Sequence, residues 1–236
     1  MVNSPGFGLA IETSSRVGSV AVVEDGSVVA EEAFSHGLQH ATGLLPMIDS
    51  MLRGRGRSPG DLQQVYVSAG PGSFTGLRIG ITVAKSIALA SPGVKLVAVP
   101  TLDVLAENAP AEAKHLVVVL DAKRGQIFTA RYERDSGGDW VVREPAHLDT
   151  LAAMLERAAR PLHLLGEGIP YHRQAIPNSA DILITPADSW RPRAGVVARL
   201  GLAMARRGEF TDADVLAPIY VRKPEAEEKW EQANRP

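Results

Sequence analysis

The chain contains no cysteine among its 236 residues. Disulfide bonds, thiolate metal sites and cysteine nucleophiles are therefore excluded. No run of about 18 apolar residues occurs, so no membrane-spanning helix is expected. The first residues, Met1 to Gly8, carry no basic stretch with an apolar segment behind it, so no secretory signal is predicted. From these absences we expect a cytoplasmic protein with no membrane partner.

The chain has no large excess of charge of either sign, since its net charge is only -2. Proteins that bind nucleic acid alone usually show a basic bias or a basic stripe with interleaved aromatics. Aromatic residues make up only 5% of this chain. We therefore expect contact with RNA only through a larger complex. With 45% hydrophobic residues, the chain can bury a core in one large domain or two small ones.

The first half of the chain alternates strand-like and helix-like patterns. Its predicted elements are strands at 8–11, 18–23 and 27–34, a helix at 39–52, a strand at 62–68, a helix at 75–90, a strand at 94–99 and a helix at 101–108. The first three strands are joined by tight polar turns, which indicates an antiparallel meander. Pro46 either bends the first helix or marks a later start, and a glycine-rich loop is expected at 53–60. Thr101 is the expected cap of the third helix.

The second half repeats this plan. Its predicted elements are strands at 116–120, 126–133 and 140–143, a helix at 148–160, strands at 162–165 and 182–185, and a helix at 194–207 stopped by Gly208. The first strand of each half ends in an acidic polar turn, at Glu12 and at Asp121. We therefore predict two α/β domains, at 1–108 and 109–224, with 194–224 returning to the first. A mobile tail is expected at 225–236.

The stretch Gly70 to Gly80 joins a strand to a helix through a glycine-rich turn. Such a turn has two possible roles. In one, its backbone N–H groups bind a phosphate; in the other, its glycines only allow a tight connection between strand and helix. Either Ser73 or Thr75 is expected to cap the helix.

Small residues recur every four positions along the helix at 75–90: Gly76, Gly80, Ala84 and Ala88. This spacing forms one ridge, which would let another helix approach closely. Other sides of the same helix are apolar too, which indicates burial on more than one side. We predict that the ridge meets a partner subunit; the alternative is ordinary interior packing.

Five motifs between the first strand and the tail carry a resemblance to a known family. They are Leu9-Ala10-Ile11-Glu12-Thr13-Ser14-Ser15, the stretch Gly70 to Gly80, Asp121-Ala122-Lys123-Arg124-Gly125, Gly166-Glu167-Gly168 and Pro218-Ile219-Tyr220-Val221-Arg222. By these motifs the chain resembles the TsaB/YeaZ family, a partner subunit in bacterial synthesis of threonylcarbamoyladenosine (t6A) on tRNA. Glu12 departs from the Asp common in the family, and Lys123 departs from its common Arg.

The resemblance implies an α/β, actin-like (ASKHA, ribonuclease H-like) fold of two duplicated domains, the second one reduced. It also implies a non-catalytic scaffold that pairs with the TsaD transferase, joined by the small ATPase TsaE, to modify adenosine 37 of tRNAs reading ANN codons. Alone, the chain is expected to form a homodimer through the same first-domain helices. The expected interface residues are Leu44, Leu45, Ile48, Gly76, Gly80, Ala84 and Ala88.

The glycine turn and the acidic turns are also candidates for anion or nucleotide contact. These residues are Glu12, Thr13, Gly70, Gly72, Ser73, Thr75, Gly76, Arg78, Asp121, Gly166 and Gly168. No cofactor of its own is expected, and ATP, ADP and Mg²⁺ are expected only in the assembled complex. The alternative function is a self-sufficient ATPase or small-molecule kinase, because paired acidic turns can position Mg²⁺ and water. The first turn lacks a glycine-rich, Asp-led pattern, so the scaffold is favoured.

No catalytic residue and no metal ligand are predicted. His36 and His40 have the His-x-x-x-His spacing that binds metal in the transferase family. However, they precede the first helix, Gly37 disfavours a helix through both, and no third ligand accompanies them. The favoured interpretation is one surface histidine and one histidine in the cap region of the helix.

Overall fold

The computed structural model describes residues 6–35 and 39–221. The predicted mobile tail at 225–236 and His36 of the histidine pair lie outside these residues. Within them, the chain forms two compact units. The first consists of residues 6–108 and 188–218, and the second of residues 109–187 and 219–221. The first unit is therefore built from two separate pieces of sequence.

The first unit contains a five-stranded sheet in the order β3-β2-β1-β4-β5. Its elements are β1 (Gly8–Glu12), β2 (Val17–Glu24), β3 (Ser27–Ser35), α1 (Gln39–Gly54), η1 (Pro59–Asp61), β4 (Gln64–Gly70), α2 (Phe74–Ala90), β5 (Lys95–Pro100), α3 (Thr101–Ala106) and α5 (Ala194–Arg206). The first three strands pair antiparallel, whereas β4 pairs parallel with both β1 and β5. The predicted meander is confirmed.

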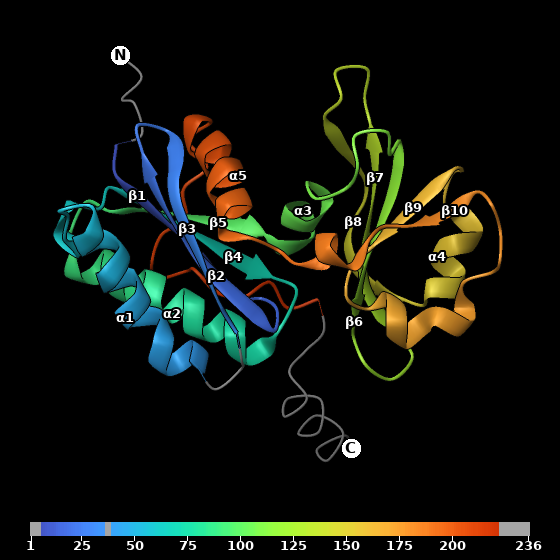
Figure 1. Ribbon diagram of the computed structural model, residues 1–236, viewed down its shortest axis with the longest axis horizontal. Helices are drawn as coiled ribbons and strands as arrows, with labels where there is room; N and C mark the ends of the chain where they lie inside the picture. The colour runs from blue at the N-terminus through green and yellow to red at the C-terminus, as the bar shows by residue number, and fades with distance from the viewer. Residues whose placement is uncertain (1–5, 36–38, 222–236) are drawn as a thin grey trace, which may run out of the picture. The chain divides into compact units, whose positions relative to one another are not determined.

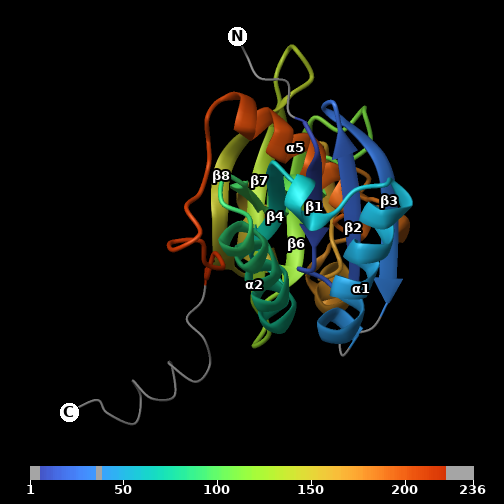
Figure 2. The same cartoon turned by 90° about the vertical axis from the view of Figure 1, so that its left-hand side faces the viewer.

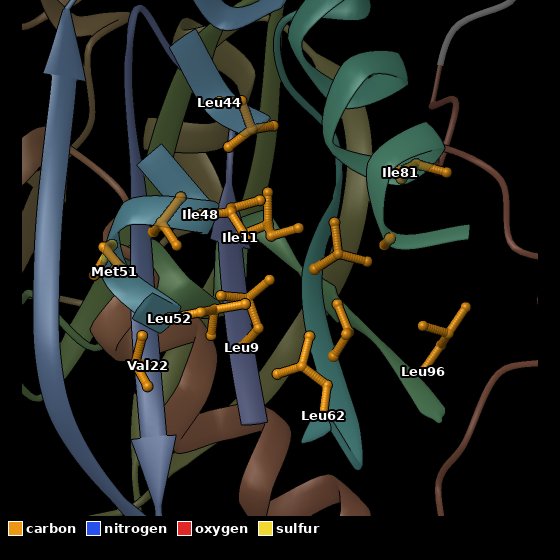
Figure 3. Packing of buried hydrophobic residues seen from close by; sticks show 14 of the residues in the cluster. Leu9, Ile11, Val22, Leu44, Ile48, Met51, Leu52, Leu62, Ile81 and Leu96 are labelled. Atoms are coloured by element: carbon orange, nitrogen blue, oxygen red, sulfur yellow. The ribbon is translucent and has the colours of Figure 1, made fainter. Parts of the chain in front are cut away.

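Helices cover both faces of this sheet, with α1 and α2 on one face and α5 on the other (Figure 1). Successive strand residues point to opposite faces, so Leu9 and Ile11 of β1 face α1 while Ala10 faces α5. Figure 3 shows Leu44, with its neighbours on the buried side of α1, packed over β1 and β2. The smaller side chains on the other face let α5 come close, where Gly201 lies against the ring of Tyr66.

The second unit repeats the strand order of the first, as β8-β7-β6-β9-β10. Its elements are β6 (His115–Asp121), β7 (Ile127–Arg134), β8 (Trp140–Asp149), α4 (Leu151–Arg157), β9 (Leu162–Leu165), η2 (Ile169–Ala175) and β10 (Ile182–Ile184). The 3₁₀ turn η3 (Ala187–Trp190) begins at the last residue of this piece and continues into the sequence of the first unit. The pairing directions also match, since β6, β7 and β8 are antiparallel and β6, β9 and β10 are parallel. The duplication is confirmed, and the short η2 stands where the first unit has α2, so the second unit is the reduced one.

Two predicted helices differ from the structure. The helix expected over 148–160 is only Leu151–Arg157, because β8 runs on to Asp149 and Thr150 caps the helix with its side chain. Pro161 also disfavours helical backbone at the residue before it. Thr101 does not cap α3; Pro100 holds the N-cap position, and the Thr101 hydroxyl instead accepts a hydrogen bond from the Gly70 N–H at 3.1 Å.

The region around the first helix also differs from the prediction. The helix begins at Gln39 and passes through Pro46, so the proline does not mark its start. The helix then continues to Gly54, and the 3₁₀ turn η1 takes up part of the expected loop at 53–60. Proline is tolerated on the exposed side of this helix, although it removes one backbone donor.

Candidate functional site

The acidic turn after β1 is enclosed by its own chain. The Glu12 side chain is fully buried. One carboxylate oxygen accepts the N–H of Ser14 at 2.5 Å and its hydroxyl at 2.6 Å, and the other accepts the hydroxyl of Ser68. The carboxylate therefore braces the turn against β4.

The glycine turn after β4 packs directly onto this acidic turn. The Ser73 N–H donates to the carbonyl oxygen of Ser14 at 2.7 Å. A Cβ atom at Gly72 would lie 2.5 Å from that same oxygen, and one at Gly76 would lie 1.9 Å from the carbonyl oxygen of Thr13. The glycines are thus required by close backbone contact within the chain, without any ligand.

Three N–H groups of the glycine turn donate hydrogen bonds within the chain. Gly70 donates to Thr101, Ser73 donates to Ser14, and the N–H of Gly76 donates to the Ser73 hydroxyl at 3.2 Å. Ser73 is thereby confirmed as the N-cap of α2, and Thr75 is not the cap. A phosphate cradle needs free N–H groups aimed at one point, and these three donors are already bonded within the chain, which agrees with a tight turn. Contact of Arg78 or Thr75 with an anion stays a prediction.

The small-residue ridge of α2 faces inward. Gly76, Gly80 and Ala84 are buried, and a Cβ atom at Gly80 would lie 2.3 Å from the Thr13 hydroxyl. The prediction that these three residues meet a partner subunit is wrong, because β1 and the turn behind it already occupy that side. Ala88 is half-buried against the same core.

The predicted interface residues of α1 include both buried and exposed side chains. Leu44 and Ile48 are buried in the core beneath α1, so they are not surface contacts. Leu45 remains 56% exposed. Of the seven residues expected at the interface, Leu45 is therefore the one whose side chain is clearly accessible.

The exposed surface of α1 and α2 carries apolar side chains that the sequence interpretation missed. The two helices lie side by side on one face of the sheet (Figure 2). Leu89 is 70% exposed and Phe74 is 41% exposed. The guanidinium of Arg78 stacks 3.9 Å from the centre of the Phe74 ring. We call Leu45, Phe74 and Leu89 the α1/α2 surface. Leu45 was among the predicted interface residues, whereas the only signal for Phe74 and Leu89 was the apolar character of α2 on most of its sides.

The acidic turn of the second unit is more open. Asp121 is the last residue of β6. It accepts a hydrogen bond from the backbone N–H of Lys123 at 3.2 Å, and its carboxylate lies 3.2 Å from His172 Nε2. The Lys123 ammonium lies 2.8 Å from the same carboxylate. Burial by itself would raise the pKa of Asp121, but the hydrogen bonds from Lys123 and His172 lower it below its usual value.

Glycines again allow the close approach in the second unit. A Cβ atom at Gly166 would lie 2.3 Å from the Val119 carbonyl oxygen, and one at Gly168 would lie 2.7 Å from the Asp121 backbone nitrogen. The structure therefore brings Gly166 and Gly168 together with Asp121, and it brings Glu12 and Thr13 together with the first glycine turn. These are two separate sets, one in each unit.

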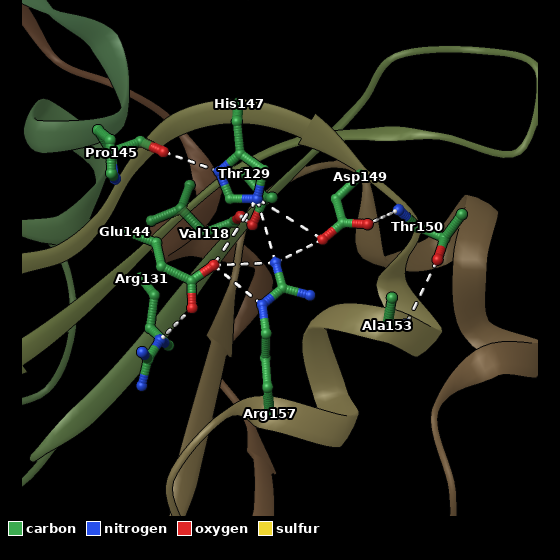
Figure 4. Close-up of polar contacts among 10 residues, drawn as sticks. All are labelled: Val118, Thr129, Arg131, Glu144, Pro145, His147, Asp149, Thr150, Ala153 and Arg157. Atoms are coloured by element: carbon green, nitrogen blue, oxygen red, sulfur yellow. Dashed lines mark hydrogen bonds and ion pairs between the residues drawn. The ribbon is translucent and has the colours of Figure 1, made fainter.

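A polar network in the second unit was not predicted either (Figure 4). The Arg157 guanidinium on α4 lies 2.9 Å from Glu144 and 2.5 Å from Asp149, both on β8, and Arg131 on β7 lies 2.8 Å from Glu144. We call these four residues the Arg157 network. Hydrogen bonding to Arg157 lowers the pKa of Glu144. At Asp149 burial by itself would raise the pKa, but the hydrogen bond from Arg157 helps to hold it below its usual value. Charge compensation makes the network a structural link between α4 and β8.

Across 6–35 and 39–221, no group of three or more histidine, aspartate and glutamate side chains is placed to hold a metal ion. Over the same ranges, no helix is long and apolar enough to cross a bilayer.

Comparisons with known proteins agree with this architecture. A family model described as "TsaD: tRNA N6-adenosine threonylcarbamoyltransferase" matches residues 24–230. The solved structure of YeaZ from Pseudomonas aeruginosa is 26% identical, with a TM-score of 0.76, covering 91% of this chain and 99% of that one. The fold is thus the α/β, actin-like (ASKHA) fold with a duplicated plan.

Sequence relatives narrow this class to one family. The tRNA threonylcarbamoyladenosine biosynthesis protein TsaB of Bacillus subtilis is 32% identical over 234 residues, covering 96% of this chain and 99% of the relative. The protein of the same name from Escherichia coli is 29% identical, covering 91% of this chain and 94% of the relative. The chain belongs to the TsaB/YeaZ family.

Proposed function

We propose that the chain is a non-catalytic subunit in t6A synthesis, which pairs with a TsaD-like transferase that modifies adenosine 37 of tRNA. Membership of the TsaB/YeaZ family supports the pathway, since its relatives are named for threonylcarbamoyladenosine biosynthesis. A TsaE-like ATPase as a third member, and a homodimer in the absence of the transferase, are part of the same proposal and follow from the family resemblance.

The α1/α2 surface is the proposed pairing site, and its exposed apolar side chains are the observation that carries the proposal. Leu45, Phe74 and Leu89 stand on neighbouring helices of one sheet face, whereas the buried ridge of α2 is used within the chain. Apolar and aromatic side chains in the centre of an interface supply most of its affinity. The ring of Phe74, stacked under Arg78, offers such an anchor.

The geometry of the first acidic turn favours this role over independent ATP hydrolysis. Both oxygens of the Glu12 carboxylate already accept hydrogen bonds from serine donors, and the turn is covered by Ser73 and Gly76. These contacts support a structural role for the turn over phosphate binding. Nucleotide and Mg²⁺ elsewhere in the assembled complex stay a prediction.

Reconstitution of t6A formation from purified components, with and without this chain, tests the pathway. We expect t6A only when the chain and the transferase subunit are both present. ATP turnover by the lone chain with Mg²⁺, with no effect on t6A formation, would instead support the ATPase alternative.

Substitutions on the α1/α2 surface test the pairing site. Leu89→Glu and Leu45→Glu each place a charge on this surface and should weaken co-elution with the transferase about tenfold or more. Val142→Glu in the second unit, where the side chain is 47% exposed, is the matched control and should leave pairing unchanged. Equal pairing by all three variants would remove the α1/α2 surface from the proposal.

A further inference from the structure

The segment that contains α5 has a charge pattern unlike the rest of the chain. Between Trp190 and Arg207 there are five arginines and no aspartate, glutamate or lysine, in a chain whose net charge is -2. The five are Arg191, Arg193, Arg199, Arg206 and Arg207, and we call them the α5 arginine surface. All five side chains are exposed.

The opposite side of α5 is anchored in the core, so the arginines are held outward. Val197 and Leu202 are buried against the sheet, and Gly201 meets the ring of Tyr66. The start of the helix is fixed by the Ala194 N–H, which donates to the Ser19 hydroxyl at 2.8 Å, and by the Gly195 N–H, which donates to Glu31 at 3.0 Å. The apolar side of α5 is therefore not free for insertion into a lipid surface.

The periodicity of the helix sets the spacing of two of these charges. Arg199 and Arg206 are seven residues apart, which is close to two turns, so they share one side of α5 about 10 Å apart along its axis. The Arg199 side chain is 58% exposed. Two guanidinium groups on one exposed side of a rigid helix form a short cationic track.

Three carboxylates partly compensate the five arginines. Arg193 pairs with Glu31 at 2.6 Å, Arg199 pairs with Glu107 at 2.8 Å, and Arg207 pairs with Glu209 at 2.5 Å. Within residues 6–35 and 39–221, Arg191 and Arg206 have no carboxylate at ion-pair distance. Exposed ion pairs contribute little to stability, so a paired guanidinium is able to exchange its carboxylate for a more highly charged anion. The surface retains a net positive charge.

We propose that the α5 arginine surface binds the phosphate backbone of tRNA when the chain is part of the t6A-forming complex. This inference rests on the proposed function, and it gives the chain a direct contact to the RNA substrate. The planar guanidinium donates two parallel hydrogen bonds to phosphate oxygens, which favours arginine for this task. Because only a few cations are involved, the lone chain binds RNA weakly, and the contact adds to those of the transferase.

Salt-dependent binding of a labelled tRNA to the reconstituted complex tests this contact. Arg199→Gln combined with Arg206→Gln removes two charges. At about 0.1 M salt we expect roughly tenfold weaker binding, and the slope of log affinity against log salt should become shallower by about 1 to 2. Arg199→Lys combined with Arg206→Lys should keep most of the affinity and the slope.

The control is Arg143→Gln on the second unit, which breaks another partly exposed arginine–glutamate pair, with 2.8 Å between Arg143 and Glu133. It should leave affinity and slope unchanged, and all variants should keep the thermal midpoint of the wild type. An unchanged slope in the Arg199/Arg206 double variant, or the same loss with Arg143→Gln, would overturn the proposal. The proposal would also be overturned if the Arg199/Arg206 double variant no longer co-eluted with the transferase, because the surface would then be a contact with protein and not with RNA.

The two proposals fail in distinguishable ways. If the wild-type chain neither joins the transferase nor supports t6A formation, the proposed function is wrong, and the RNA contact falls with it. If the complex forms and makes t6A but the slope is insensitive to Arg199 and Arg206, only the RNA contact is wrong.

Discussion

Replacing Gly76 by alanine is expected to destabilise the protein, although alanine is the better helix former. A Cβ atom there would lie 1.9 Å from the Thr13 carbonyl oxygen, where ordinary contacts are 3.4–4 Å. The oxygen belongs to the backbone beside the Ser73–Ser14 hydrogen bond, so no side-chain rotation relieves the clash. The higher helix propensity of alanine would stabilise the protein by about 1 kcal/mol. Overpacking would destabilise it by about 1–3 kcal/mol, and by more when the backbone must move. We expect the free energy of unfolding to fall by about 2 kcal/mol.

Urea unfolding followed by circular dichroism measures this change, and a thermal scan should show a midpoint about 4–8 °C lower. Gly43→Ala is the matched control, because Gly43 lies inside α1 and a Cβ atom there meets nothing within 4 Å. It should raise stability by about 0.5–1 kcal/mol. A Gly76→Ala variant that is as stable as the wild type but no longer pairs with the transferase would refute the reasoning and restore the ridge as an interface.

Three further predictions concern the cap of α2 and two responses to pH. Ser73→Ala should cost about 1 kcal/mol in urea unfolding because it removes the N-cap, whereas Thr75→Ala should cost nothing measurable; equal losses would contradict the cap assignment. In the Arg157 network both carboxylate pKa values are lowered on folding, so the network stabilises the protein above about pH 4–5 and this contribution fades as the pH falls further. Arg157→Gln should lower stability at neutral pH by about 1 kcal/mol and flatten the acid dependence, and parallel wild-type and variant curves from pH 7 to 3 would refute this. Burial lowers the pKa of His163 below its usual 6.5, so the unfolded chain binds a proton that the folded chain does not, and stability declines as the pH falls below 6.5. His163→Leu should remove that decline in a pH series of unfolding midpoints, and an unchanged decline would assign it to other groups.

Local patterns were sufficient to predict much of the architecture. The strands β1 to β3 alternate over short runs and are joined by tight turns, so their pairing is a local matter. The start of α2 followed from Ser73 and the glycines before it, because a cap is also local. The duplicated plan was visible because the equivalent first strands end in the acidic residues Glu12 and Asp121.

The direction of the α2 ridge was not predictable in this way. A helix that is apolar on most sides gives no sequence signal for which side meets its own sheet. The choice is made by contact with Thr13, about 60 residues earlier in the chain, where only glycine at position 76 leaves room for the carbonyl oxygen.

Long-range polar contacts were missed for the same reason. The members of the Arg157 network are spread over β7, β8 and α4, and no spacing rule links them. The contact between Thr101 and Gly70 joins the ends of two neighbouring strands, so a hydroxyl that looked like a local helix cap serves a different strand.

The discontinuous first unit has a consequence for folding during synthesis. Its α5 lies beyond the roughly 80 residues that form the second unit. At about 5–20 residues per second, the ribosome needs on the order of 5–20 seconds to deliver α5 after β5 has emerged. During that interval the sheet face bearing Ala10, Val23 and Tyr66 lacks the cover that α5 provides. The nascent chain therefore exposes part of this apolar face until α5 has been made, and the first unit cannot be completed before the second unit has been synthesised.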